Sequence, residues 1–146
     1  MKFAHLIRRT FTSIHNQPLT HSDMAVAQDL LLPDELNLWV RLQPRDQRHS
    51  LVVLERFDNI LPLARATERR AALLHDLGKC ESSLGVLGRI LATIVGPRTD
   101  SFRRYLAHEE IGIQLLTSIS DPRTLQVLRM DDDDAVGVAL RRADEV

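Results

Sequence analysis

Apolar residues recur at intervals of three and four along nearly the whole sequence, and no other feature constrains the fold as strongly. A helix turns by about 100° per residue, so this spacing gathers the apolar side chains on one face of a helix. The sequence contains no run of alternating β-branched residues long enough for a strand, no internal repeat and no Ser/Gly-rich linker. We therefore predict an all-α protein built as a compact bundle of several helices.

Prolines, glycines and capping residues divide the chain into these helices. We expect Gly78 to be the left-handed residue that follows a helix end, and the aspartates at 131–134 to be the solvated start of the last helix. Residues 1–43 are interpreted as a helical extension that packs on a core domain of residues 44–146. Helices are expected at 3–14, from Thr20 or Ser22 to Leu32, from Pro33, after Pro44 and Asp46 to Asp58, from about Thr67 to Gly78, at 84–95, from Asp100 or Ser101 to Ser118, and from Pro122.

Composition excludes several classes of protein. With 146 residues, 44% hydrophobic and 27% charged, the chain is one ordinary globular domain rather than a disordered or fibrous protein. A formal charge of −1 and an aromatic content of 4% argue against a nucleic-acid partner. The arginines that would form such a surface are interpreted as solvated helix faces; they are Arg65, Arg69, Arg70, Arg103 and Arg104.

The sequence also predicts that the chain does not cross a membrane. No segment reaches the roughly 18 apolar residues of a membrane span, because Arg89 interrupts the longest candidate at 84–96. The N-terminal residues lack the apolar stretch of a secretory signal, and the single Cys80 excludes a disulfide framework. We therefore expect a cytoplasmic protein.

Two histidines and one aspartate share helix faces with apolar residues. His49 begins one apolar stripe, His108 begins another, and Asp144 follows Leu140 by one turn. An ionised carboxylate in the core needs a cation, a metal ion or several hydrogen-bond donors. The alternatives are core histidines without a ligand role and an exposed Asp144 at a fraying helix end. The His49 stripe consists of Val52, Val53, Phe57 and Ile60, and the His108 stripe of Ile111, Gly112, Leu115, Leu116 and Ile119.

A pair of adjacent polar residues ends the apolar helix in the segment AALLHDLGK. His75 and Asp76 are poor packing choices at this position, but a divalent cation would take an imidazole nitrogen and a carboxylate oxygen there. Lys79 follows at once, and its compact ammonium suits a phosphate oxygen. Only Lys2 and Lys79 are lysines among the 19 cationic side chains, so a lysine at this position is unusual for this chain.

These residues resemble a known family. His49, His75-Asp76 and Asp144 are similar to the H…HD…D signature of the HD-domain metal-dependent phosphohydrolases, and LHDLGK and HEEIG are similar to local forms in that superfamily. The resemblance covers residues 44–146, and the whole chain looks like small HD-domain proteins of actinobacteria.

The resemblance implies a role for each matching residue. His49, His75, Asp76 and Asp144 would bind one divalent ion (Mn, Fe, Co, Ni, Zn or Mg), with Asp76 able to bridge to a second. Asp76, Lys79 and His108 would serve catalysis, with Lys79 contacting the substrate phosphate and Asp76 or Glu109 orienting a water. The stretch VLRMDDDD carries no histidine before the last helix, unlike the multi-metal branches of the family.

We therefore predict a metal-dependent phosphohydrolase that acts on a phosphomonoester or a nucleotide. The alternative is a regulatory HD module that binds a nucleotide or a protein partner without turnover. The first hypothesis rests on the complete ligand set and Lys79, and the alternative on the missing histidine and the small size.

Overall fold

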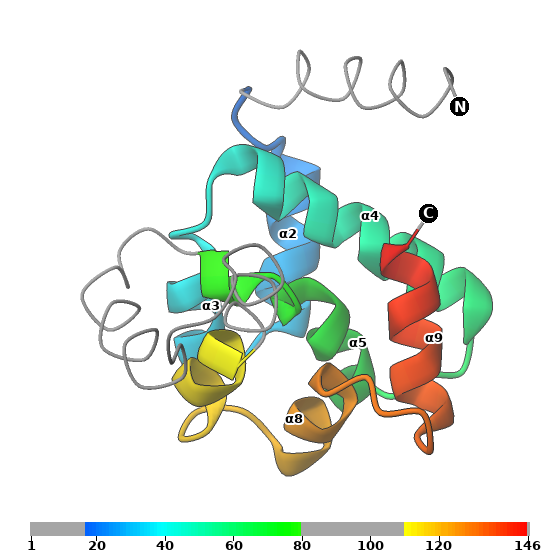
Figure 1. The fold of residues 1–146 in the computed structure, drawn as a ribbon. Coiled ribbons are helices and arrows are strands. Elements are labelled where there is room, and N and C mark those ends of the chain that lie inside the picture. Colours follow the sequence, from blue (N-terminus) through cyan, green and yellow to red (C-terminus); the bar gives the residue numbers. More distant parts are fainter. Residues whose placement is uncertain (1–16, 80–109, 146) are drawn as a thin grey trace, which may run out of the picture.

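The computed structural model describes residues 17–79 and 110–145, and within these ranges the protein is all-α, as predicted (Figure 1). Residues 110–116 are also helical. The named elements are α2 (His21–Leu30), α3 (Pro33–Trp39), α4 (Pro44–Ile60), α5 (Ala66–Leu74), the 3₁₀ turn η1 (Leu77–Lys79), α8 (Pro122–Leu128) and α9 (Ala135–Asp144).

Most of the helix starts follow local signals in the sequence. Thr20 caps α2, where its hydroxyl accepts from the backbone N–H of Asp23 at 3.2 Å. Pro33, Pro44 and Pro122 each occupy the first helical position, where a missing N–H costs nothing. These starts agree with the predicted ones, except that Thr20 rather than Ser22 is the cap of α2 and that Pro44 is the first residue of α4 instead of preceding it.

Helix α5 lies at the centre of the bundle. It packs against α4 and α8 most extensively and also contacts α2, α3 and α9 (Figure 1). The residues from Ala71 to Leu74 are 0–1% exposed, because neighbouring helices cover the segment on all sides. Helix α4 in turn packs along α9. The largest buried apolar side chains of this core are Trp39, Phe57, Leu73, Leu74, Leu77, Ile111, Leu116 and Leu140.

The end of α5 differs from the prediction. The helix ends at Leu74, and the chain continues through a turn at His75 and Asp76 into η1 instead of remaining helical to Gly78. No glycine in the described ranges has a positive φ, so Gly78 is not a left-handed cap. A Cβ atom on Gly112 would lie 3.3 Å from the backbone N of Gly78, which indicates that this glycine permits close packing of the two segments.

The core face of α4 also differs slightly from the predicted stripe. Val53 and Phe57 are fully buried as expected, but Ile60 is 41% exposed, and Leu54 is buried in its place. Ile60 is the last residue of the helix, where the chain turns away toward α5. The predicted stripe therefore included one residue, Ile60, that lies beyond the part of α4 covered by other helices.

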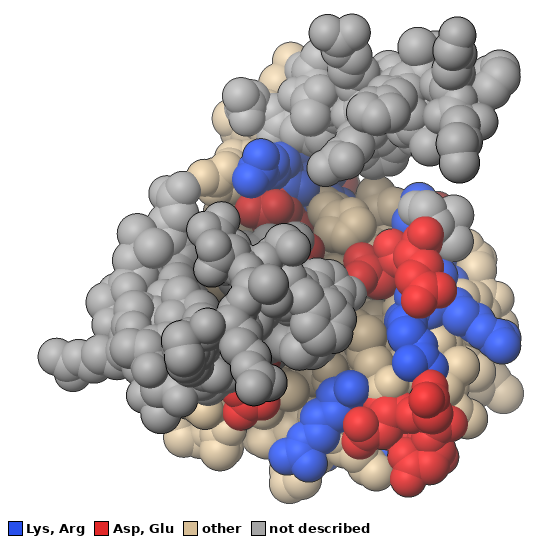
Figure 2. All heavy atoms as spheres, viewed as in Figure 1, with Lys and Arg blue, Asp and Glu red and all other residues tan. Residues whose placement is uncertain are grey.

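The acidic run at 131–134 precedes the last helix as predicted, but only its first three residues are solvated. Asp131, Asp132 and Asp133 are exposed, and Asp134 caps α9 by accepting from the backbone N–H of Val136 at 3.0 Å. Acidic and basic side chains lie next to one another over the described part of the face in Figure 2. An ion pair joins Arg141 to Asp132.

Some expectations concern parts of the chain outside the described residues. These are the helices at 3–14 and 84–95 and the first part of the helix expected from 100 to 118. The domain boundary at residue 43 remains a prediction. Among the described helices, none has the length and the apolar content needed to cross a bilayer.

Candidate metal centre

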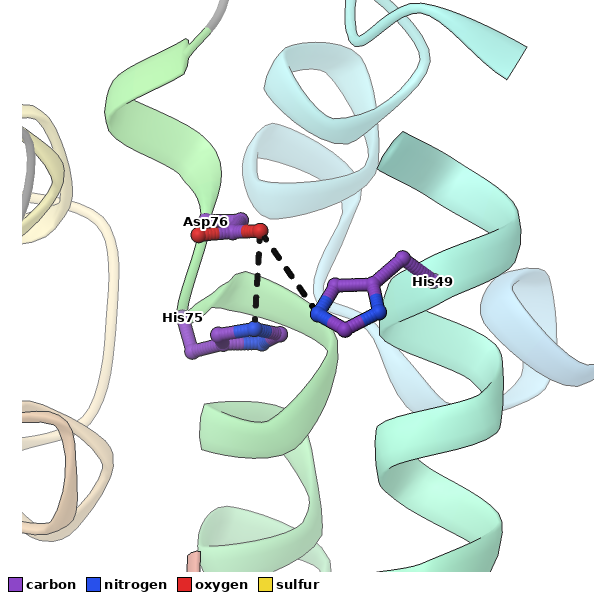
Figure 3. Close-up of side chains that lie close together, drawn as sticks. All are labelled: His49, His75 and Asp76. Carbon is purple, nitrogen blue, oxygen red and sulfur yellow. Dashed lines mark ion pairs between the residues drawn. The ribbon is translucent and has the colours of Figure 1, made fainter. Parts of the chain in front are cut away.

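Three separate elements bring the candidate ligands together. His49 lies in the first half of α4, His75 and Asp76 form the turn after α5, and Asp144 is the last residue of α9. Figure 3 shows the imidazole rings of His49 and His75 and the carboxylate of Asp76 turned toward a common point. The convergence of these four side chains was expected from the sequence, and their role as metal ligands remains a prediction.

The spacing of the nitrogen and oxygen atoms suits one metal ion. His49, His75 and Asp76 each offer one ligand atom, and these atoms lie within 4.8 Å of one another. Asp76 Oδ2 lies 3.9 Å from His49 Nε2 and 3.6 Å from His75 Nε2. Bonds of about 2.0–2.2 Å to one tetrahedral ion place its ligand atoms roughly 3–4 Å apart. Both distances from Asp76 fall in that range.

The environment of His75 provides independent support for a cation. Its side chain is 2% exposed, and Nδ1 lies 2.8 Å from the carbonyl oxygen of Ala72, which can only accept. In the neutral ring the proton is therefore on Nδ1, and the lone pair of Nε2 points into the cluster. Nε2 is buried and has no aligned hydrogen-bond partner among the described residues. Either a bound cation or a proton shared with the nearby carboxylates would satisfy this nitrogen.

Asp144 contacts both imidazoles. Its Oδ1 lies 3.0 Å from His49 Nε2 and 3.2 Å from His75 Nε2, and only the first contact is aligned as a hydrogen bond. The side chain is 26% exposed, so it faces the cluster rather than solvent. Asp144 is outside the group of three whose ligand atoms are all mutually close. In this arrangement it is a partner of the two histidines and is within reach as a fourth ligand.

The charges of the cluster reinforce one another. Burial alone would lower the pKa of His75, but the contact with Asp144 and the charges of Asp76 and Asp144 raise it above its ordinary 6.5. Burial alone would raise the pKa of Asp144, but the two imidazoles hold it far below its ordinary 3.8. The carboxylates thus stabilise a proton on His75, and a divalent cation at the same place would benefit from the same charges.

Metal affinity should therefore depend on pH through His75. A metal ion binds the deprotonated imidazole, so the raised pKa of His75 makes protons compete with the ion to above pH 6.5. We expect affinity to increase as pH rises through this folded-state pKa, with proton release on binding. In the metal-free protein, the ion pairs of His75 with Asp144 and Asp76 stabilise the fold only while His75 is protonated. Their contribution to the free energy of unfolding is therefore lost as pH rises through the raised pKa of His75.

Calorimetric titrations of metal ion into protein at pH 6, 7 and 8, in buffers of different ionisation enthalpy, measure both quantities. Affinity that does not change between pH 6 and 8, without proton release, would contradict this assignment of His75.

The remaining predicted site residues are not placed. Lys79 ends η1, directly after the His75-Asp76 turn, but its side chain lies outside the described part of the structure. His108 and Glu109 also lie outside it, immediately before the helix at 110–116. Ile111 and Leu116 of the stripe predicted after His108 are fully buried.

The contacts that support the ligands were not anticipated from the sequence. Trp39 Nε1 donates to Ser50 Oγ at 3.0 Å, and Gln47 Nε2 donates to the carbonyl of Trp39 at 3.2 Å. These bonds fix the start of α4 on both sides of His49. The Ala72 contact with His75 has a recognisable signal, because residues three apart are neighbours on a helix.

Comparison with known proteins adds no relative. No protein-family model matches this chain, and no curated protein or solved structure matches it either.

Proposed function

We propose that the protein is a metal-dependent phosphohydrolase whose divalent ion is held by His49, His75 and Asp76, with Asp144 as the fourth candidate ligand. The observation that carries the proposal is the convergence of two imidazole nitrogens and a carboxylate oxygen within 4.8 Å, one of them the buried Nε2 of His75. Two imidazoles with carboxylates form a mixed N/O donor set, which suits Mn, Fe, Co, Ni or Zn.

The exposure of the ligands suggests from which side a substrate approaches. The side chain of His75 is 2% exposed and forms the floor of the cluster, whereas those of His49 and Asp76 are 36% and 16% exposed. A bound divalent ion would lower the pKa of a water and polarise a phosphoryl group. Asp76 would orient that water, and Lys79 would hold a phosphate oxygen from the adjacent turn. His108 would neutralise charge on the phosphoryl group.

The resemblance to the HD-domain superfamily supports the same proposal. The spacing of His49, His75-Asp76 and Asp144 and the hexapeptide LHDLGK are the basis for this part of the argument. The substrate class, a phosphomonoester or a nucleotide, comes from this resemblance and from Lys79.

Activity assays with added metal test the function. We expect protein reconstituted with Mn²⁺, Co²⁺ or Zn²⁺ to release phosphate from at least one member of a panel of nucleotides and phosphomonoesters. Chelation should remove the activity, and re-addition of the ion should restore it. Stoichiometric metal binding without turnover of any panel member would favour the regulatory module. The absence of both binding and turnover would contradict the proposal as a whole.

The same assay separates a phosphate contact from a helix-end charge at Lys79. Lys79→Arg keeps the charge but replaces a compact ammonium by a wide guanidinium. We expect unchanged metal content and melting temperature, with turnover or phosphate binding lower by at least several-fold. Unchanged turnover would show that Lys79 contributes only charge.

A further inference from the structure

The last turn of α9 has to be held in place if Asp144 is to face the two histidines. Asp144 is the final residue of that helix, and the last four carbonyl groups of a helix have no partner within it. Terminal turns therefore fray unless other groups bind them. A rotation of this turn about the helix axis would move the Asp144 carboxylate away from both imidazoles.

One arginine on the facing helix binds that turn. Arg56 Nη1 of α4 donates to the carbonyl oxygen of Ala143 at 3.3 Å, in a partly buried contact between residues 87 positions apart. The carbonyl belongs to the residue just before Asp144. A cation at a helix C-terminus also interacts favourably with the helix dipole. The contact therefore combines hydrogen bonding and charge at the point where the turn would otherwise loosen.

The position of Arg56 on α4 couples this contact to the site. Arg56 follows His49 by seven residues, which is close to two full turns, so both side chains project from the same face of α4. This face packs along α9, and Ala143 is fully buried at the contact. The same face of α4 thus carries the candidate ligand His49 and also Arg56, which binds the helix end that carries Asp144.

We propose that Arg56 is a positioning residue: it fixes the last turn of α9 against α4 and thereby sets the Asp144 carboxylate beside His49 and His75. The effect on metal binding rests on the proposed function, whereas the effect on the helix end does not. Arg56 acts through Asp144 and has no direct part in the chemistry.

Arg56→Met removes the donor and keeps most of the apolar stem. We expect faster amide hydrogen exchange confined to the last turn of α9, and Co²⁺ affinity lower by about 10-fold or more, the usual size for loss of a group that orients a ligand. Arg142→Met is the matched control, because Arg142 is an exposed arginine on the same turn. It removes a charge from the same turn without removing the Arg56 donor, so it should change both quantities much less than Arg56→Met does. Arg56→Gln is the second variant if Arg56→Met does not fold.

A double-mutant cycle with Asp144→Ala distinguishes positioning from general destabilisation. If Arg56 acts through Asp144, then Arg56→Met should cause no further loss of Co²⁺ affinity in the Asp144→Ala background. An equal loss in both backgrounds, or unchanged exchange in the last turn, would overturn the proposal. If the wild-type protein binds no Co²⁺, the proposed function fails, and the exchange measurement alone decides the role of Arg56.

Discussion

Asp76→Asn is expected to lower affinity for a divalent ion by at least about 100-fold. Loss of a group that only orients a ligand lowers metal affinity by about 10- to 100-fold, and loss of a ligand itself should lower it at least as much. Asp76 supplies the one carboxylate in the group of three mutually close ligand atoms, and asparagine offers only a neutral carbonyl oxygen. The proposed phosphohydrolase activity should disappear with the ion. The side chain keeps its shape, so the fold should persist. Metal content after dialysis and calorimetric titration measure the effect.

The control for this variant is Asp131→Asn, an exposed aspartate before α9 and away from the cluster. It should retain full metal content and activity. Stoichiometric metal in Asp76→Asn, at wild-type affinity, would contradict the assignment of the site. Loss of activity with retained metal would instead assign Asp76 a role toward the water alone.

Arg123→Met is expected to lower the free energy of unfolding by about 3 kcal/mol. This value is near the lower end of the range measured when one partner of a buried ion pair is removed, because Arg123 itself is partly exposed. Its side chain, 24% exposed, donates to Glu68 Oε1 at 3.1 Å and to Asp134 Oδ2 at 2.7 Å. The carboxylates are 7% and 10% exposed. Removing the shared cation leaves two nearly buried carboxylates short of a partner. Urea denaturation followed by the fluorescence of Trp39, the single tryptophan, measures the change.

The pH dependence of that stability provides a second readout. The Arg123 guanidinium holds the pKa of Asp134 below its ordinary 3.8. The stabilisation from this pair is therefore present above pH 3.8 and is lost as pH falls through the lower, folded-state pKa. The variant should lose less stability than the wild type on acidification. Arg129→Met, an exposed change at the end of α8, should leave stability and its pH dependence unchanged. A loss below 1 kcal/mol in Arg123→Met would show that the network contributes no more than surface pairs typically do.

The sequence by itself determined the features whose causes are local. The starts of α2, α3, α4, α8 and α9 were predictable, because a capping oxygen or an N-terminal proline acts within one helical turn. Periodicity alone also indicated that His49 and Asp144 face inward, since the helix turns by a fixed angle per residue. The adjacency of His75 and Asp76 needed no structure at all.

Features that depend on distant partners were decided only by the tertiary structure. The early end of α5 at Leu74 accompanies the close approach of Gly112 to Gly78, which no local pattern specifies. Glu35 lies in the first turn of α3, where it accepts from the backbone N–H of Leu32 at 2.9 Å. Its side chain is fully buried, and Ser120, 85 residues away, donates to its other carboxylate oxygen.

The same division applies to the candidate site. Sequence supplied the residue types and their direction, but not that His75 is buried while His49 remains partly exposed, nor that Asp144 contacts both imidazoles. The support from Arg56 likewise joins α4 to the end of α9. Burial and shared contacts are properties of several helices packed together, whereas periodicity describes one helix at a time. For this protein the sequence therefore predicted which groups meet, and only the packing of α4, α5 and α9 determined how deeply each group is buried and which contacts it makes.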